Sequence, residues 1–271
     1  WRCSRHEQHG SVQTTYSSPQ KPDALFRLYC DSGVFSSIAT VVGREDFESL
    51  YLPVAERAAE RIQDAPLMPN AFREHGGALQ CALRAGLLAV KLCDVTIFSP
   101  TSTAAERMEG DRQYRWLAFC ATLATVYLQS VAHVQQILDS GEIYSHANDD
   151  TLLDLKKSFV HQWRSNPNLS VTRLYPFLSS FFFPGSFSHL KIEMLGELGV
   201  AINPLLSAPA TEIPLAKVVR QAVDKTLTDE MQARSKQISP SSVQPGTASP
   251  DPVATPAFNR EQETRENTNI S

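Results

Sequence analysis

A histidine followed by two glycines and a regular run of apolar residues is the feature that most constrains this chain. The stretch runs from Arg73 to Val90 and reads REHGGALQCALRAGLLAV. Its large apolar residues recur every three or four positions, as they do along one face of a helix: Leu79, Leu83, Leu87 and Val90. Gly76 and Gly77 can adopt backbone angles that other residues avoid. We therefore expect a helix over Gly77–Cys93 that begins sharply, with His75 just before it.

The bulk properties exclude several classes of function. The 271 residues suffice for one sizeable core, and the formal net charge of -4 gives no overall attraction to nucleic acid or to an anionic membrane. No run reaches the roughly 18 apolar residues of a membrane span, and we recognise no signal peptide. The five cysteines include no Cys-x-x-Cys pair, which favours free thiols in a reducing cytoplasm: Cys3, Cys30, Cys81, Cys93 and Cys120.

Apolar periodicity predicts a mainly helical chain. The expected helices are Glu45–Gln63, Gly77–Cys93, Asp111–Leu138, Leu152–Trp163, His189–Ile202 and Ile213–Arg234. Pro53 predicts a kink or break within the first of them. Ala24–Cys30 is expected to dock on the core, Val34–Val42 to form a strand or a helix, and Val171–Phe183 to anchor the core with its aromatic residues. Asp94–Gly110 and Asp139–Asp150 are expected to be connections, the first with room for one helical turn and the second for a short extended pair near Ile143.

Composition divides the chain into three parts. Residues 1–23 are polar and form a loose leader, in which His6 and His9 are better explained as solvated residues than as a metal clip. Residues 24–236 form one helical domain. Residues 237–271 are rich in proline, serine and threonine and are expected to be a disordered tail. The predicted fold class is therefore all-α.

Five short segments follow one another in an informative order: Phe47–Pro66, His75–Leu79, Arg115–Leu123, Phe177–Pro204 and Leu215–Ala222. Together they resemble the N-terminal domain of TraI-type conjugative relaxases, the MobH group of integrative elements. That domain is often labelled a helicase and is similar to HD-superfamily hydrolases. The resemblance implies an HD-like helical bundle that covers most of the folded chain.

The chain departs from this family where the family binds metal. The family's His after Gly-Gly-Leu-Leu-x falls on Cys81, and a Glu three residues later falls on Arg84. The His-Asp pair that names the superfamily falls on Thr125 and Val126, and the last Asp falls on Val223. His75, with Gly76 and Gly77, is the part of the family's His-rich run that remains, and it forms a candidate residual site.

These departures have a chemical consequence. An HD-type site holds one or two divalent ions that acidify the water attacking phosphorus. Such ions need several oxygen or nitrogen ligands at about 2.0–2.6 Å. Valine offers none, a thiolate is soft, and the charge of Arg84 would repel a cation. We therefore predict that the protein has no metal, no cofactor and no catalytic residue.

Two other sites were weighed. A relocated metal site would need at least three ligands to converge from scattered residues: His75, His133, His146, His161, His189, Asp149, Asp150 and Asp154. Nothing in their spacing requires this. Cys81 could be a nucleophile with His75 as its base, but a buried structural thiol explains it more simply. A Ser/His/Asp signature, a phosphate-binding Gly-rich loop and a His-Glu-x-x-His motif are absent from the sequence.

The sequence thus predicts a catalytically inactive, TraI-like protein of an integrative or conjugative element. It would bind a protein of the conjugation machinery, or DNA, although no basic patch is evident and no membrane partner is expected. The alternative is an active metal-dependent relaxase or phosphohydrolase that nicks DNA with ligands not recognised in the sequence. A decayed gene is a third explanation, and the regular amphipathic patterns of the helices count against it.

Overall fold

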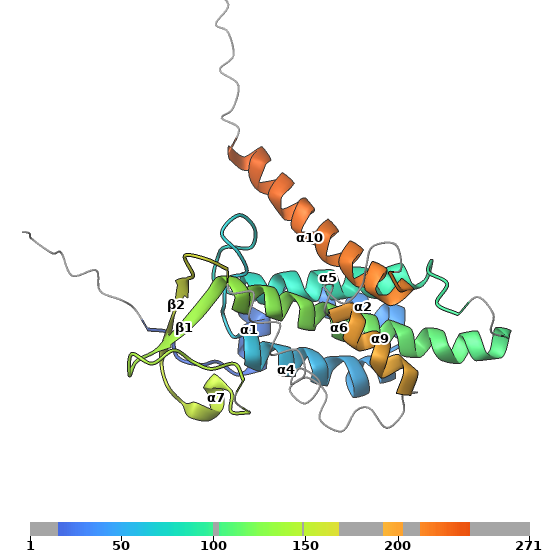
Figure 1. The fold of residues 1–271 in the computed structure, drawn as a ribbon, viewed down its shortest axis with the longest axis horizontal. Coiled ribbons are helices and arrows are strands. Elements are labelled where there is room, and N and C mark those ends of the chain that lie inside the picture. Colours follow the sequence, from blue (N-terminus) through green and yellow to red (C-terminus); the bar gives the residue numbers. More distant parts are fainter. Residues whose placement is uncertain (1–15, 100–102, 148, 168–191, 203–211, 239–271) are drawn as a thin grey trace, which may run out of the picture.

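The computed structural model describes residues 16–99, 103–147, 149–167, 192–202 and 212–238, and these form a helical bundle with a small sheet at one end (Figure 1). In chain order the elements are α1 (Pro22–Tyr29), α2 (Val34–Val42), α3 (Arg44–Asp46), η1 (Phe47–Tyr51), α4 (Leu52–Ile62), α5 (Gly77–Cys93), α6 (Ala104–His133), β1 (Val134–Leu138), α7 (Leu152–Leu155), β2 (Phe159–Trp163), α9 (Ile192–Ile202) and α10 (Pro214–Ile238). The predicted all-α class is confirmed.

The core is built where α5, α6 and α10 pack together. Gly86 makes the close approach of α5 and α6 feasible, because a Cβ at this position would lie 2.8 Å from the ring of Phe119. Trp116 and Phe119 of α6 are almost completely buried in this core. The projecting end of α10 leaves the bundle and points away from it (Figure 1).

The helix predicted over Glu45–Gln63 is present, with its break. The chain passes from α3 through the π-helical turn η1 into α4, and Pro53 stands in the first turn of α4. Proline has no N–H to donate to the preceding turn and its ring crowds that turn, so the widened turn lies immediately before it. Tyr51 at the end of η1 packs against Phe119, with 5.2 Å between ring centres.

The bounds predicted for α5 are confirmed, whereas those predicted for α6 are wrong at both ends. The helix begins at Ala104 rather than at Asp111, because Thr103 and Glu106 form a reciprocal capping box in a segment predicted to be a connection. The helix ends at His133, and Val134–Leu138 forms strand β1.

The prediction of a helix over Leu152–Trp163 is also wrong. Helix α7 ends after one turn at Lys156, whose φ of 52° is left-handed. Phe159–Trp163 then pairs antiparallel with β1, Val134 lying opposite Trp163 and Leu138 opposite Phe159. β-Branched and aromatic residues at the start of β2 favour a strand once a partner strand is available. The extended pair expected near Ile143 is confirmed by its bridge to Ile137.

The N-terminal segments are helical or paired with the sheet. Val34–Val42, for which strand and helix were both open, is helix α2. Ser17 exchanges two backbone hydrogen bonds with Phe159 at the edge of the sheet.

The predicted aromatic anchor Val171–Phe183 lies outside the described residues. Within the described ranges no single helix is long and apolar enough to cross a bilayer; α1 and α2 meet that test only together, and they are bent by 108°.

Candidate functional site

Three of the five positions on which the resemblance to HD-type domains would place metal ligands lie in the apolar core. Cys81, Val126 and Val223, on α5, α6 and α10, are 0%, 0% and 2% exposed. Burial raises the pKa of the Cys81 thiol to about 12, so the sulfur is neutral at physiological pH. This also removes the thiolate that a nucleophilic role for Cys81 would require.

The two remaining positions do not complete a metal site. The hydroxyl of Thr125 is buried and has no hydrogen-bond partner among the described residues, but one neutral oxygen cannot hold a divalent ion. Arg84 lies on the outer side of α5, where its Nε donates to Asp31 at 2.9 Å and Nη1 lies 3.8 Å from Glu230. Its charge is therefore offset by carboxylates rather than directed at the interior. The residues at these positions do not fit an HD-type metal, and no catalytic step follows from them.

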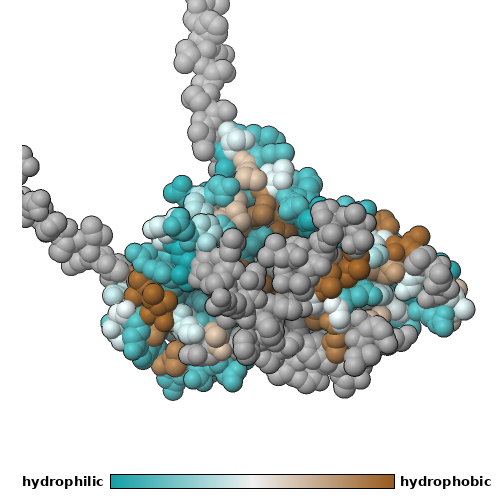
Figure 2. Space-filling view, viewed as in Figure 1, coloured by the Kyte–Doolittle hydropathy of each residue, from teal (hydrophilic) through white to brown (hydrophobic). Residues whose placement is uncertain are grey.

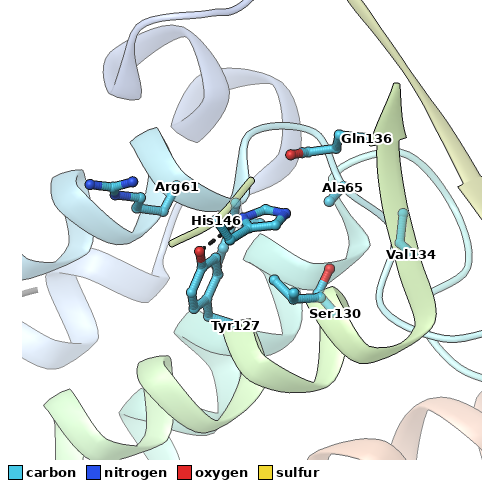
Figure 3. A pocket seen from close by; sticks show the side chains of 9 residues that line it. Arg61, Ala65, Tyr127, Ser130, Val134, Gln136 and His146 are labelled. Atoms are coloured by element: carbon cyan, nitrogen blue, oxygen red, sulfur yellow. Dashed lines mark hydrogen bonds between the residues drawn. The ribbon is translucent and has the colours of Figure 1, made fainter. Parts of the chain in front are cut away.

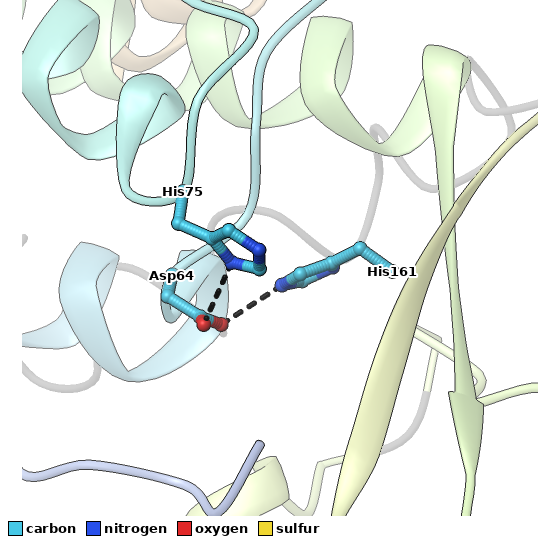
Figure 4. Close-up of side chains that lie close together, drawn as sticks. All are labelled: Asp64, His75 and His161. Carbon is cyan, nitrogen blue, oxygen red and sulfur yellow. Dashed lines mark hydrogen bonds and ion pairs between the residues drawn. The ribbon is translucent and has the colours of Figure 1, made fainter. Parts of the chain in front are cut away.

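Three other side chains converge near the sheet: Asp64, His75 and His161, called here the Asp64 cluster (Figure 4). Nδ1 of His75 lies 3.2 Å from one oxygen of Asp64, and Nε2 of His161 lies 2.8 Å from the other. The side chains of Asp64 and His161 are 11% and 7% exposed, whereas that of His75 is 66% exposed. The cluster therefore has a buried side and a side open to solvent.

The backbone before α5 places His75 beside Asp64. Gly76 has a φ of +75°, and its N–H donates to the carbonyl of Asp64 at 2.7 Å. Its lack of a side chain is also required by packing, because a Cβ there would lie 2.1 Å from the ring of Tyr29. The sharp start of α5 that the glycine pair predicts is thus present, and it also fixes the position of His75 immediately before it.

Strand β2 supplies His161. The residue lies opposite Gln136 in the ladder, and its ring packs edge-on against that of Phe159 at 5.2 Å. Its Nδ1 is buried and has no hydrogen-bond partner among the described residues. The helix predicted over Leu152–Trp163 would not have placed His161 in a strand, and no motif indicated that His161 would lie beside Asp64.

The surroundings of Asp64 keep its carboxylate ionised. Burial alone would raise the pKa of Asp64, but the hydrogen bond and charge of His161, together with those of His75, outweigh burial and lower it. The negative charge is also felt at Tyr29, whose pKa is raised by burial and then by Asp64.

A second cluster begins at Arg61, three residues before Asp64, and its side chains are buried. Arg61, Tyr127 and His146 line a cavity of about 10 Å³, which is no larger than one water molecule (Figure 3). Tyr127 Oη and His146 Nδ1 are 2.9 Å apart, and Arg61 donates to the backbone carbonyl of Asp149 and to the hydroxyl of Tyr144. Burial and the charge of Arg61 lower the pKa of His146 to about 3, so this histidine is neutral.

The other residues considered for a relocated site have separate roles. Asp154 caps α7, and Nδ1 of His133 lies 2.8 Å from the carbonyl of Gln129. His189 lies outside the described residues. In the part of the chain that is described, the Asp64 cluster is the one group of three or more metal-capable side chains with ligand atoms within 4.8 Å of one another, and it does not include Cys81. Asp64 was missed in the sequence, where it follows the last apolar residue of α4 and shows no motif.

Comparison with known proteins gives a family. The sequence profile of the TraI_2 family, described as "Putative helicase", matches residues 20–245. A comparison with curated proteins finds no match. The matched range includes the whole described bundle together with both histidine clusters. The chain therefore belongs to the TraI_2 family.

Proposed function

We propose that this protein is a TraI-type domain that acts in conjugative DNA transfer in the cytoplasm by binding a protein partner, without HD-type catalysis. Membership of the family supports the link to conjugation. The observation that carries the proposal is the apolar packing of Cys81, Val126 and Val223 at the junction of α5, α6 and α10. A divalent ion would lose its water shell there and find no carboxylate or imidazole in return.

The matched family's description as a helicase is not supported by the motifs of this chain. A helicase that uses ATP needs a glycine-rich loop whose backbone N–H groups hold the phosphates, typically Gly-x-x-x-x-Gly-Lys-Ser/Thr. None of the 12 glycines of this sequence begins such a motif. We therefore place its function in recognition rather than in ATP-driven strand separation.

The charge distribution favours a protein partner over DNA. The net charge is -4, and several arginines on the described surface are paired with acids: Arg44 with Glu48, Arg84 with Asp31, Arg112 with Asp46 and Arg220 with Glu212. DNA binding relies on cations that are free to neutralise phosphates. Figure 2 shows hydrophilic residues and a few apolar ones side by side over α10, and protein interfaces have the same mixture of polar and apolar surface.

The proposal is tested with the full chain and supercoiled plasmid. With Mg²⁺ or Mn²⁺ we expect no nicking above that of a buffer control, and calorimetry with either ion should show no stoichiometric site. We also expect the chain to co-elute with a purified DNA-processing or coupling protein of the same element. Nicking above background, or tight binding of duplex DNA at physiological salt with no protein complex, would overturn the proposal.

One observation favours a second function, that of a metal-dependent phosphohydrolase or relaxase with ligands away from the family's positions. Asp64, His75 and His161 bring two imidazoles and a carboxylate together at a half-open surface. The same plasmid assay distinguishes this function from the first. Nicking that is lost in His75→Ala would place the chemistry at the Asp64 cluster.

A further inference from the structure

We propose that Asp64, His75 and His161 form a binding site for a divalent transition-metal ion of the zinc type. Two imidazole nitrogens and one carboxylate oxygen are the donors that such ions prefer, whereas Mg²⁺ and Ca²⁺ prefer oxygen alone. The inference does not rest on the first proposed function and gives the second one its metal: His75 belongs to the His-rich run of the resemblance, whereas Asp64 and His161 lie outside the positions on which its ligands fall.

The distances within the cluster suit one ion. Zinc binds nitrogen and oxygen at about 2.0–2.2 Å, so ligand atoms around a tetrahedral zinc lie about 3.3–3.5 Å apart. In this structure the two imidazole nitrogens lie 3.2 and 2.8 Å from the carboxylate oxygens, and the three ligand atoms lie within 4.8 Å of one another. A small movement of one imidazole therefore brings all three to coordinating distance.

The cluster combines fixed ligands with an open side. Asp64 and His161 are held by the backbone bond from Gly76 and by the ladder between β1 and β2. His75 is 66% exposed, so it can move and an ion can enter beside it. Three protein ligands leave a fourth position for water, which is the arrangement of an open rather than a closed zinc site.

The simplest competing explanation is a hydrogen-bonded trio that binds no metal. An ionised carboxylate only accepts hydrogen bonds, so each imidazole nitrogen that faces Asp64 carries a proton in that state. A metal ion must displace these protons: in a neutral imidazole the proton moves to the opposite ring nitrogen, and an imidazolium loses one proton to solvent. Binding should therefore weaken as the pH falls and the imidazoles become protonated. A trio without metal affinity would show no binding at any pH.

The main experiment is calorimetric titration of the full chain with Zn²⁺ near neutral pH. We expect one ion per chain, with an affinity that falls as the titration is repeated at lower pH. His75→Ala should weaken binding by roughly 100-fold or more, the scale on which a metal site responds to damage in its ligand shells. His133→Ala removes a histidine outside the cluster and should leave zinc binding unchanged, and circular dichroism checks that both variants are folded.

The N-terminal leader needs its own control, because Cys3, His6 and His9 can also bind zinc. A variant with serine at all three positions should keep the site. Cobalt in place of zinc should give the visible bands of nitrogen and oxygen ligation without sulfur-to-metal charge transfer.

Loss of the zinc site in the leader variant, or retention of full affinity in folded His75→Ala, would overturn the inference. Zinc binding without nicking leaves the proposed function standing, whereas nicking lost in His75→Ala would overturn that function and keep the metal site.

Discussion

Two histidine clusters lie at the same end of α4, and the charge at the centre of each has the opposite sign. Arg61 and Asp64 are three residues apart, yet Arg61 is surrounded by carbonyl and hydroxyl oxygens and Asp64 by two imidazoles. The Arg61 cluster, formed with Tyr127, Tyr144 and His146, is closed around a cavity of about 10 Å³. The Asp64 cluster exposes one of its histidines. The comparison indicates that the first cluster stabilises the fold and that the second is free to exchange partners.

The largest effect that would test this comparison is on stability. Arg61→Met should lower the free energy of unfolding by about 3 kcal/mol, because it removes the charged donor that joins α4 to the part-buried carbonyl of Asp149 and to the hydroxyl of Tyr144. Asp64→Asn should lower it by only about 1 kcal/mol, since an amide can still bond to both histidines. Urea unfolding of the two variants measures the difference. Equal losses would mean that both clusters serve the fold alone.

The next effect concerns Gly76, which joins the Asp64 cluster to α5. Gly76→Ala should destabilise the protein by about 2–3 kcal/mol, because the added Cβ meets the ring of Tyr29 at 2.1 Å and the φ is +75°. Gly141→Ala is a matched control with a φ of +84° and no atom within 4 Å, so it should lose only about 1 kcal/mol. If the two variants lose similar stability in thermal unfolding, the ring of Tyr29 can move aside, and Gly76 does not hold His75 in place.

The same two clusters show what the sequence could and could not predict. Helical periodicity located α5 with its bounds, and the glycine pair correctly marked a constrained start beside His75. Each of these signals is local. The Asp64 cluster depends on contacts between residues 64 and 161, and the pairing of β1 with β2 that supplies His161 overrides the apolar periodicity that suggested helices.

The positions on which the resemblance would place metal ligands show the converse. Cys81, Val126 and Val223 were expected to be unsuitable for metal binding from their chemistry alone, and the structure adds that they are packed in the core. For a site whose residues are absent, the residue types are informative without coordinates. For a site assembled from a helix end, a loop and a strand, the residue types alone are not informative, because the ligands share no regular spacing in the sequence.

As the pH is lowered, the two clusters should reduce the stability of the protein over different pH ranges. The pKa of His146 is lowered to about 3 in the folded state, so the unfolded chain binds the extra proton and stability falls as the pH drops below about 6.5. From pH 7 to pH 5 this loss amounts to roughly 2 kcal/mol. His146→Gln should remove it, as urea unfolding at the two pH values will show.

The folded pKa of Asp64 is lowered as well, so its contribution is fully present above the unfolded value of about 3.9 and is lost only as the pH falls through the lower folded value. Asp64→Asn should therefore remove a loss of stability that lies below about pH 4, whereas His146→Gln acts between pH 7 and pH 5. An unchanged slope between pH 7 and pH 5 in His146→Gln would show that this environment has been assigned to the wrong residue.

The smallest effect is expected at His75 when no metal is present. Its side chain is 66% exposed and its bond to Asp64 is 3.2 Å long, so solvent screens most of the interaction. With a chelator present, His75→Ala should change the free energy of unfolding by less than about 0.5 kcal/mol in urea. A larger loss would make His75 a structural partner of Asp64, comparable to the partners of Arg61. If His75→Ala loses little free energy of unfolding but much of its zinc affinity, metal binding is the reason for an imidazole at this position.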